Sequence, residues 1–127
     1  MNSPKKIVQD NFEIEIFSND YYLCKVNGTR EFVIDDLIKL VEAQKQLGAF
    51  KMPILVLCDI DASTNTDLLN YVSKNANSPY VTSDAFVIKS LSQRILANFY
   101  LKVNLPERPT KFFNNSKDAI SWLNQFI

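Results

Sequence analysis

Histidine is absent from the sequence, and glycine and cysteine are scarce, with two residues of each among 127. Without histidine the chain has no Ser-His or Cys-His catalytic pair and no His-metal site of its own. Two glycines are too few for a glycine-rich phosphate-binding loop. Cys24 and Cys58 lie in apolar segments with neither a CxxC motif nor metal-ligand spacing. We therefore expect two small buried hydrophobic residues in a reducing compartment.

Net charge is also absent, because 14 Lys and Arg residues balance 14 Asp and Glu residues. This balance removes the main electrostatic argument for a nucleic acid or an anionic membrane as a partner. No apolar run approaches the roughly 20 residues that span a bilayer. Residues 1–12 lack the long apolar region of a signal peptide. We therefore expect a cytoplasmic protein without nucleic-acid binding or membrane insertion.

The composition that remains is that of an ordinary soluble domain. Hydrophobic residues make up 46% of the chain and charged residues 22%, close to the averages for globular proteins. A chain of 127 residues fits one domain, which buries roughly two thirds of its unfolded surface. We expect a single domain over residues 1–127, in which residues 1–10 form a loosely ordered N-terminal segment.

The first half of the chain changes from a strand pattern to a helix pattern and back. Apolar and charged residues alternate over 11–17, and a second strand is predicted over 21–26, which indicates an antiparallel hairpin. From 34 to 47 the apolar residues recur at helical spacing, and Gln44 is the one polar residue in the apolar stripe. Residues 54–60 are apolar on both faces up to Asp59, as in a buried parallel strand.

The second half alternates helices and strands. Helices are predicted over 66–75 and 91–103, strands over 85–90 and 110–113, and a final helix from Asn115 or Ser116. Segments that alternate in this way form parallel strand-helix-strand crossovers. The predicted fold is therefore α/β, with the order β-β-α-β-α-β-α-β-α. An N-terminal hairpin and parallel crossovers form one mixed sheet, and the helices pack on it.

Three loops are expected to meet at one edge of this sheet. They follow the predicted parallel strands at Asp59, at Lys89 and at Phe113. The carboxyl ends of parallel strands share an edge, and binding and chemistry in such folds usually occur there. The loop over residues 59–67 carries three acids and three hydroxyls, so it is the first place to expect a site.

One interpretation of this loop is phosphoryl transfer. Asp59-Ile60-Asp61 resembles the DxD nucleophile motif of haloacid-dehalogenase-type phosphatases. In those enzymes one aspartate takes the phosphoryl group and the other acts as acid and base. The chemistry needs Mg²⁺, and no acidic pair follows the later predicted strands to hold the metal. This interpretation is therefore ranked low.

A related interpretation is a receiver domain, with Asp59 as phospho-acceptor, Ser90 as the switch hydroxyl and Lys111 as the charge partner. Asp35-Asp36 would then replace the metal-binding acids. A receiver begins with a strand and a helix, however, and these two acids follow the second predicted strand instead of the first. We rank both phosphoryl-transfer interpretations last and expect no enzyme activity, no catalytic residue, no metal and no cofactor.

The predicted order of elements resembles the STAS domain of anti-sigma-factor antagonists, the SpoIIAA-like proteins. Signalling members carry a phosphorylatable Ser or Thr after the third strand, in an Asp-Ser-Ser-Gly-like sequence, where this chain has Asp61-Ala62-Ser63-Thr64-Asn65. Residues 84–113 resemble a group of short stand-alone bacterial STAS-like proteins. The resemblance implies a non-catalytic cytoplasmic regulatory or protein-interaction module, whose partner is an anti-sigma factor or a kinase.

The resemblance also implies a site. Ser63 and Thr64 are the expected phosphorylation residues, and the same hydroxyls have a simpler role as caps of the following helix. A phosphate at a helix N-terminus meets N–H groups, and Lys89 is the nearby cation that can pair with it. The expected partner-binding residues lie in loops 59–67 and 89–92, and they are Asp59, Asp61, Thr66, Lys89, Ser90 and Ser92.

The alternative function is the binding of a small apolar ligand or lipid. STAS-like folds include branches that resemble the CRAL-TRIO lipid carriers, and aromatic residues of this chain could line an apolar pocket. The simpler expectation for those aromatics is core packing. Residues 98–101 place apolar side chains on several faces of the predicted helix, which favours a homodimer surface.

Overall fold

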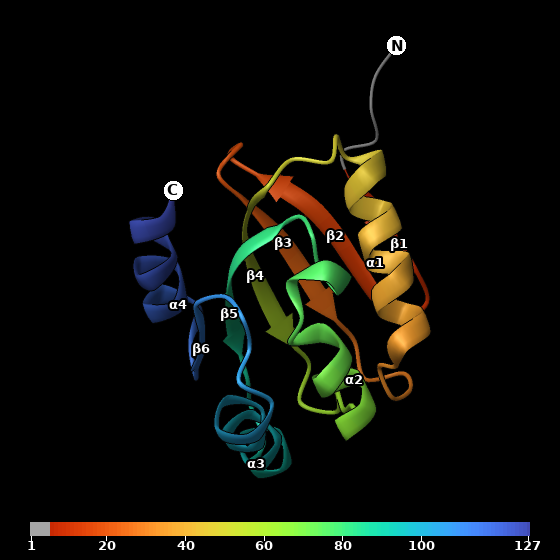
Figure 1. Ribbon diagram of the computed structural model, residues 1–127, viewed down its shortest axis with the longest axis vertical. Coiled ribbons are helices and arrows are strands. Elements are labelled where there is room, and N and C mark those ends of the chain that lie inside the picture. The colour runs from red at the N-terminus through yellow and green to blue at the C-terminus, as the bar shows by residue number, and fades with distance from the viewer. Residues whose placement is uncertain (1–5) are drawn as a thin grey trace.

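The computed structural model describes residues 6–127, in which six strands form one sheet (Figure 1). The strands are β1 (Lys6–Val8), β2 (Phe12–Phe17), β3 (Tyr21–Val26), β4 (Met52–Cys58), β5 (Val81–Val87) and β6 (Thr110–Phe113). They lie side by side in chain order. Strands β1 to β3 pair antiparallel, and β3 to β6 pair parallel. The predicted mixed sheet, with its hairpin and parallel crossovers, is confirmed.

Strand β1 corrects the prediction of a loosely ordered segment over residues 1–10. Lys6 pairs with Glu15, and Val8 pairs with Glu13. The Lys6 ammonium lies 3.7 Å from Glu13 and 3.6 Å from Glu15, but such half-exposed ion pairs stabilise little. A strand of three residues is too short to show an alternating pattern in the sequence. It is ordered because it pairs with β2. The rest of the predicted segment, residues 1–5, lies outside the described residues.

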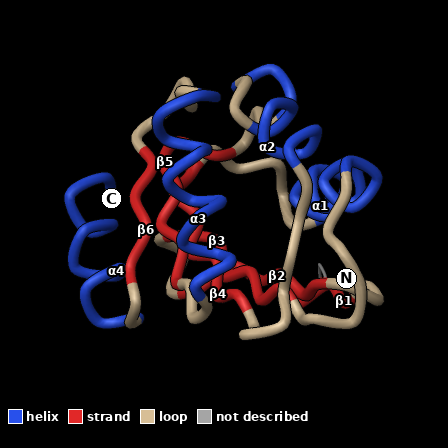
Figure 2. The backbone as a smooth tube through the Cα atoms, turned by 90° about the horizontal axis from the view of Figure 1, so that it is seen from below, coloured by secondary structure: helices blue, strands red, loops and turns tan. Residues whose placement is uncertain are grey.

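Helices cover both faces of the sheet. They are α1 (Ile34–Gln46), α2 (Thr66–Val72), α3 (Leu91–Phe99), which continues as a π-helical turn (Tyr100–Asn104), and α4 (Ser116–Leu123). Helices α1, α2 and α3 lie on one side of the sheet, and α4 lies on the other (Figure 2). The chain therefore folds into three layers, with the sheet in the middle.

The apolar run of β4 is explained by these layers. Successive side chains of a strand point to opposite faces. Ile54 and Val56 accordingly pack in the larger apolar core, beneath α1, α2 and α3. Leu55 packs in the smaller core, against Ala119 and Leu123 of α4. Both faces of β4 are buried, as its sequence predicts.

Several predicted boundaries are shifted. The strand predicted over 54–60 spans Met52–Cys58, and the helix predicted over 66–75 ends at Val72. The strand predicted over 85–90 spans Val81–Val87, although Ser and Pro around Val81 favour a loop. β5 lies between β4 and β6, and burial in a central strand overrides the local preference.

Gln44, the one polar residue in the apolar stripe of α1, is buried without hydrogen bonds to its side-chain amide. Its side chain is 0% exposed, and neither its amide nitrogen nor its oxygen has a hydrogen-bond partner within residues 6–127. Gln44→Met keeps the shape and removes the unpaired polar atoms, so it should stabilise the fold by about 1–2 kcal/mol in urea unfolding. The exposed Gln46→Met is the control. Destabilisation by Gln44→Met would contradict this account.

Candidate functional site

The predicted convergence of loops at the carboxyl edge is present, because β4, β5 and β6 are parallel neighbours. Gln93, in the first turn of α3, joins two of these loops. Its Nε2 atom donates to the carbonyl oxygens of Asp59 at 2.7 Å and Ala62 at 2.9 Å. A longer bond of 3.3 Å reaches the carbonyl of Ile60. One side chain thus holds the β4–α2 loop against the start of α3.

The other end of Gln93 completes a capping box. Its Oε1 atom accepts from the backbone N–H groups of Lys89 at 2.7 Å and Ser90 at 3.2 Å. The Ser90 hydroxyl accepts in return from the Gln93 N–H at 3.1 Å. Glutamate would also cap α3, but its ionised carboxylate only accepts, whereas glutamine donates and accepts at once. We call the bonds from Gln93 to both loops the inter-loop clamp. A glutamine at this capping position, where a glutamate would also cap, is the sequence signal for it.

Most of the predicted partner-binding residues lie at the exposed surface of this edge. Asp59, Asp61 and Lys89 are exposed, and so are Thr66 and Ser92. Asp59 and Lys89 line the same open hollow of about 440 Å³. Ser90 is half-buried as the N-cap of α3. Their joint placement at one edge is as predicted, and their partner-binding role stays a prediction.

The two predicted phosphorylation residues differ in their surroundings. The Thr64 hydroxyl donates to the Phe32 carbonyl at 2.6 Å, and the Phe32 N–H donates to the Ser63 carbonyl at 2.8 Å. The expected capping role of Thr64 is wrong, because Asn65 caps α2 by accepting from the Leu68 N–H at 2.8 Å. Ser63 is exposed.

The β4–α2 loop packs closely against the β3–α1 loop at Gly28. A Cβ atom at this position would lie 2.4 Å from the Asp61 Cβ and 2.8 Å from the Asp61 carbonyl carbon. No other residue fits without displacing the backbone of Asp61. Gly28, Phe32 and Gln93 therefore fix this loop from different sides.

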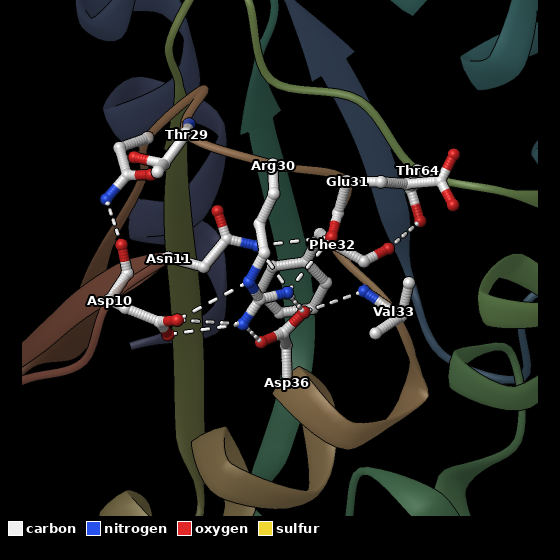
Figure 3. Close-up of polar contacts among 10 residues, drawn as sticks. Asp10, Asn11, Thr29, Arg30, Glu31, Phe32, Val33, Asp36 and Thr64 are labelled. Carbon is white, nitrogen blue, oxygen red and sulfur yellow. Dashed lines mark hydrogen bonds and ion pairs between the residues drawn. The ribbon is translucent and has the colours of Figure 1, made fainter.

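An ion-pair network holds the β3–α1 loop itself (Figure 3). The guanidinium of Arg30 lies between Asp10, at 3.2 Å, and Asp36, at 2.6 Å. Asp36 also accepts from the Val33 N–H at 2.8 Å. The Asp36 carboxylate is thus paired with Arg30 and hydrogen-bonded to the start of α1. The receiver interpretation needs the same carboxylate as a metal ligand, so these contacts count against it.

Acid should weaken this network. Burial alone would raise the pKa of Asp36, but the Arg30 guanidinium, the Val33 N–H and the Asn11 amide lower it below its ordinary 3.8. Its stabilisation is therefore complete well above pH 3.8 and is lost as the pH falls through 3.8 towards the lowered pKa. Asp36→Asn should cost about 1–3 kcal/mol near neutral pH and less in acid, as followed by urea unfolding. Asp35→Asn, at the exposed neighbour, is the matched control.

The acids of the β4–α2 loop do not gather into a larger cluster. The Asp59 carboxylate accepts from the Asp61 N–H at 3.4 Å. No group of three or more His, Cys, Asp or Glu side chains suited to a metal is found within residues 6–127. Lys111, the charge partner in the receiver interpretation, has its ammonium 5.6 Å from the centre of the Phe113 ring.

A partly open cavity of about 160 Å³ lies between the sheet and helices α1, α2 and α3. Its wall is almost wholly apolar. From the carboxyl edge inwards it is lined by Cys58 and Ile88, then by Val56 and Phe86, and on the helix side by Leu69 and Ala97. Ala62, Ser63 and Thr64 line it as well, so the β4–α2 loop forms part of its wall. The apolar pocket of the ligand-binding alternative is present here, and the aromatic residues Phe86, Tyr100 and Phe112 line it.

The inner end of the cavity contains a buried ion pair. Arg108 Nε donates to the two carboxylate oxygens of Asp84 at 2.8 and 3.0 Å. The guanidinium also donates to the Val72 carbonyl at 2.8 Å and to Asn75 Oδ1 at 3.2 Å. Burial raises the pKa of Asp84, and the Arg108 charge opposes that shift. Asp84 and Arg108 are 2% and 6% exposed, so the pair links β5 to the end of α2 within the core.

Tyr100 lies beside this pair. Its hydroxyl has no hydrogen bond of acceptable geometry within residues 6–127. Burial raises the pKa of the Tyr100 phenol, and the nearby Arg108 charge opposes that shift. The hydroxyl is therefore protonated near neutral pH. Core packing was the simpler expectation for this aromatic residue, and its burial agrees with that expectation.

Both cysteines line the cavity. Burial raises the pKa of the Cys58 thiol to about 12, although Lys89 opposes the shift, and burial also raises the pKa of Cys24. Both thiols are unpaired and protonated near neutral pH, so neither is an activated nucleophile. The expected buried position is confirmed for Cys24, whereas Cys58 is half-buried.

Comparison with protein families gives one assignment. A family model described as "Domain of unknown function (DUF7793)" matches residues 22–127. The chain belongs to the DUF7793 family. No sequence among the curated proteins matches this DUF7793 protein.

The fold of the DUF7793 protein is SpoIIAA-like. Among solved structures it is similar to an uncharacterized protein of the DUF3478 family with a SpoIIAA-like fold, from Shewanella loihica PV-4. The TM-score is 0.53 and the identity is 17%, with 88% of this chain and 91% of that chain covered. The predicted STAS-like architecture is thereby confirmed. Each helix of the DUF7793 protein within residues 6–127 is too short or too polar to cross a bilayer.

Proposed function

We propose that this DUF7793 protein is a non-catalytic module that binds a small, largely apolar molecule in its partly open apolar cavity. The cavity of about 160 Å³ carries the proposal. Protein interiors pack densely and leave few voids larger than a water molecule. At about 24 cal/mol per Å³, a fully enclosed empty cavity of this size would cost roughly 4 kcal/mol, which is an upper bound for a cavity that is partly open. A ligand that fills the cavity offsets that cost.

The size and lining of the cavity limit the ligand. An engineered apolar cavity of about 150 Å³ in another protein binds benzene. The present cavity is similar in volume and in the apolar character of its wall. The part of the ligand that the cavity holds is therefore about the size of a substituted benzene, and a whole lipid chain would extend beyond it. This limit narrows the lipid-carrier alternative to small apolar compounds.

The β4–α2 loop connects the cavity to the surface. Ala62 is buried in the cavity wall, while the next residue, Ser63, is exposed. Gln93 and Gly28 fix the position of this loop. A ligand that shifts the Ala62 side of the loop therefore changes the surface around Ser63. In this proposal, binding of the ligand in the cavity changes the surface that the module presents at its carboxyl edge.

Toluene is a suitable probe for the cavity. Saturable binding is expected in titration calorimetry, with stabilisation of about 2.7 kcal/mol when toluene reaches a hundredfold excess over its Kd. Ala97→Phe should abolish binding, because Ala97 lies in the wall and its enlarged side chain fills the space. Asn98→Phe, at the exposed neighbouring position, should bind like the wild type. Ala97→Leu replaces Ala97→Phe if the larger substitution prevents folding. Absence of binding to the wild type, or equal binding by the filled variant, contradicts the proposal.

Protein-partner binding is the second candidate function, and an exposed apolar stripe favours it. Leu91 and Ile95 of α3 are 73% and 61% exposed and stand four residues apart, so they share one helix face. Ile60 of the β4–α2 loop, which Gln93 ties to α3, is also exposed. An apolar surface of this kind is typical of an interaction site. The resemblance to anti-sigma-factor antagonists supports an anti-sigma factor or a kinase as the partner, and a second copy of the chain is the homodimer alternative.

The phosphorylation version of this candidate makes a residue-specific prediction. A cognate Ser/Thr kinase is expected to label Ser63 and to leave Thr64 unlabelled, because the Thr64 hydroxyl is engaged by Phe32. Mass spectrometry after incubation with the kinase maps the site. Ser63→Ala should abolish labelling, and Thr64→Val should preserve it. Labelling of Thr64 alone would contradict this reading of the two hydroxyls.

A further inference from the structure

Helix α3 carries a row of apolar side chains on its outer face. Leu91, Ile95 and Phe99 follow one another at four-residue spacing, and all three are exposed. The inner face of the same helix is buried at Gln93 and Ala97. Side chains four residues apart lie on the same face of a helix. The three exposed residues therefore form one strip that points away from the core.

The π-helical turn after α3 extends this strip. In a regular α-helix of about 3.6 residues per turn, each four-residue step rotates the side chain by about 40°, so a long strip gradually leaves its face. A π-helical turn contains more residues per turn, which reduces this rotation. Val103, four residues after Phe99 and within the turn Tyr100–Asn104, is 59% exposed. We call Leu91, Ile95, Phe99 and Val103 the α3 row.

The exposed area of the α3 row fits a small dimer interface. Ile60 of the β4–α2 loop, whose carbonyl accepts from Gln93, adds one more exposed apolar side chain beside the first turn of α3. Together these side chains expose the equivalent of about three complete ones, or roughly 300–400 Å² of apolar surface. Homodimer interfaces are about 65% apolar, so this surface implies roughly 450–600 Å² per copy. The total reaches the roughly 1,000 Å² that a specific interface needs.

Charge favours a second copy of the chain as the occupant of the α3 row. The chain carries 14 basic and 14 acidic residues. Two copies therefore have no net repulsion, and proteins near zero net charge tend to associate. The α3 row itself contains no charged residue, so it offers no ion pair to select an acidic or a basic partner. A two-fold axis across the row sets apolar side chains against apolar ones, as an isologous interface requires.

We infer that two copies of the protein associate through their α3 rows, which pack against each other about a two-fold axis. Ile95 and Phe99 lie at the centre of the interface, and Leu91 and Val103 lie at its ends. The small area makes the dimer reversible on dilution. The inference is independent of the cavity function, because the cavity lies on the inner face of α3, where Ala97 lines it.

Sedimentation velocity at concentrations up to the submillimolar range tests the inference. The wild type should change from monomer to dimer as its concentration rises. Ile95→Glu puts a charge at the centre of the α3 row and should weaken the dimer at least about tenfold. Because Ile95 is exposed, this variant should fold normally. Ile38→Glu, at a similarly exposed isoleucine on α1, is the matched control and should dimerise like the wild type.

A second pair of variants tests the geometry of the row. Val103→Glu lies on the row and should also weaken the dimer. Leu101→Glu lies in the same π-helical turn and is exposed, but it stands two residues from Phe99 and so points away from the row. It should leave the dimer unchanged. Equal effects of the two variants would contradict the assignment of Val103 to the row.

The outcomes are distinct. Loss of the dimer in Ile95→Glu but not in Ile38→Glu, with unchanged circular dichroism, supports the inference. A wild type that stays monomeric at every concentration overturns it, whether the row then faces another protein or solvent. A dimer that survives Ile95→Glu overturns it as well, because the interface then lies elsewhere. Toluene binding should persist in monomeric Ile95→Glu, so a failure of this inference leaves the cavity function standing, and the reverse holds too.

Discussion

Replacing Arg108 by leucine should destabilise the protein by about 3–5 kcal/mol. The substitution leaves the Asp84 carboxylate, which is 2% exposed, without its cation. It also removes the donors to Val72 and Asn75, which tie the end of α2 to this part of the core. Removal of one partner from a buried ion pair costs far more than the pair itself contributes, because the remaining charge stays buried.

Urea unfolding of three variants separates these terms. The double variant Asp84→Leu/Arg108→Leu should recover most of the loss, because no charge remains buried. Arg94→Leu removes an exposed arginine on α3 and should change stability by less than about 0.5 kcal/mol. A double variant as unstable as Arg108→Leu would show that the hydrogen bonds, and not the unpaired carboxylate, dominate.

The single variant should also respond to pH. Burial raises the pKa of Asp84 even in the wild type, and removal of Arg108 takes away the cation that opposes this shift. A carboxyl group whose pKa is higher in the folded state than its ordinary 3.8 stabilises the fold when it is protonated, at pH values below 3.8. That stabilisation is lost as the pH rises through the folded-state pKa. The destabilisation by Arg108→Leu should therefore shrink in acid. A loss that is constant from acid to neutral pH contradicts this assignment.

Replacing Gln93 by alanine should have the next largest effect, a loss of about 2–4 kcal/mol in urea unfolding. The amide donates to three carbonyl oxygens of the β4–α2 loop and accepts from two backbone N–H groups. These groups are partly or fully buried, so several of them lose their partners without gaining water. Ser92→Ala, at the exposed neighbour on α3, should change stability by less than about 0.5 kcal/mol.

Gln93→Glu distinguishes the clamp from the cap. The carboxylate still accepts from Lys89 and Ser90, so α3 keeps its capping box. It has no donor for the carbonyl oxygens of Asp59 and Ala62, which it would repel. Near neutral pH this variant should be almost as unstable as Gln93→Ala, and protonation in acid should restore part of the loss. Wild-type stability of Gln93→Glu at neutral pH would mean that only the cap matters.

The fold was largely predictable because its elements have clear local patterns. Strands β3 and β6 match the predicted ranges, and the change from period two to helical spacing located α1. Strand β1 was missed, because three residues carry no period and pair only through β2. The start of β5 was missed as well, since Val81 and Ser83 are buried by neighbouring strands rather than by any preference of their own.

The site was predictable in position but not in organisation. Parallel strands bring the loops after Asp59 and Lys89 to one edge whatever their sequences. The cavity depends on how three helices pack on the sheet, which no single segment encodes. Arg108 lies in a proline-flanked stretch that indicates only a helix break, and its partner Asp84 is 24 residues away. Such a pair is visible only once β5 and the following loop are folded.

Titration of isotope-labelled protein with toluene, followed by amide chemical shifts, tests the central claim most directly. The account predicts saturable shifts around the cavity, at Val56, Leu69 and Phe86, in the wild type and in Asn98→Phe. Ala97→Phe should show none of them. The cavity function is contradicted if these amides do not move at the solubility limit of toluene, or if they move equally in Ala97→Phe.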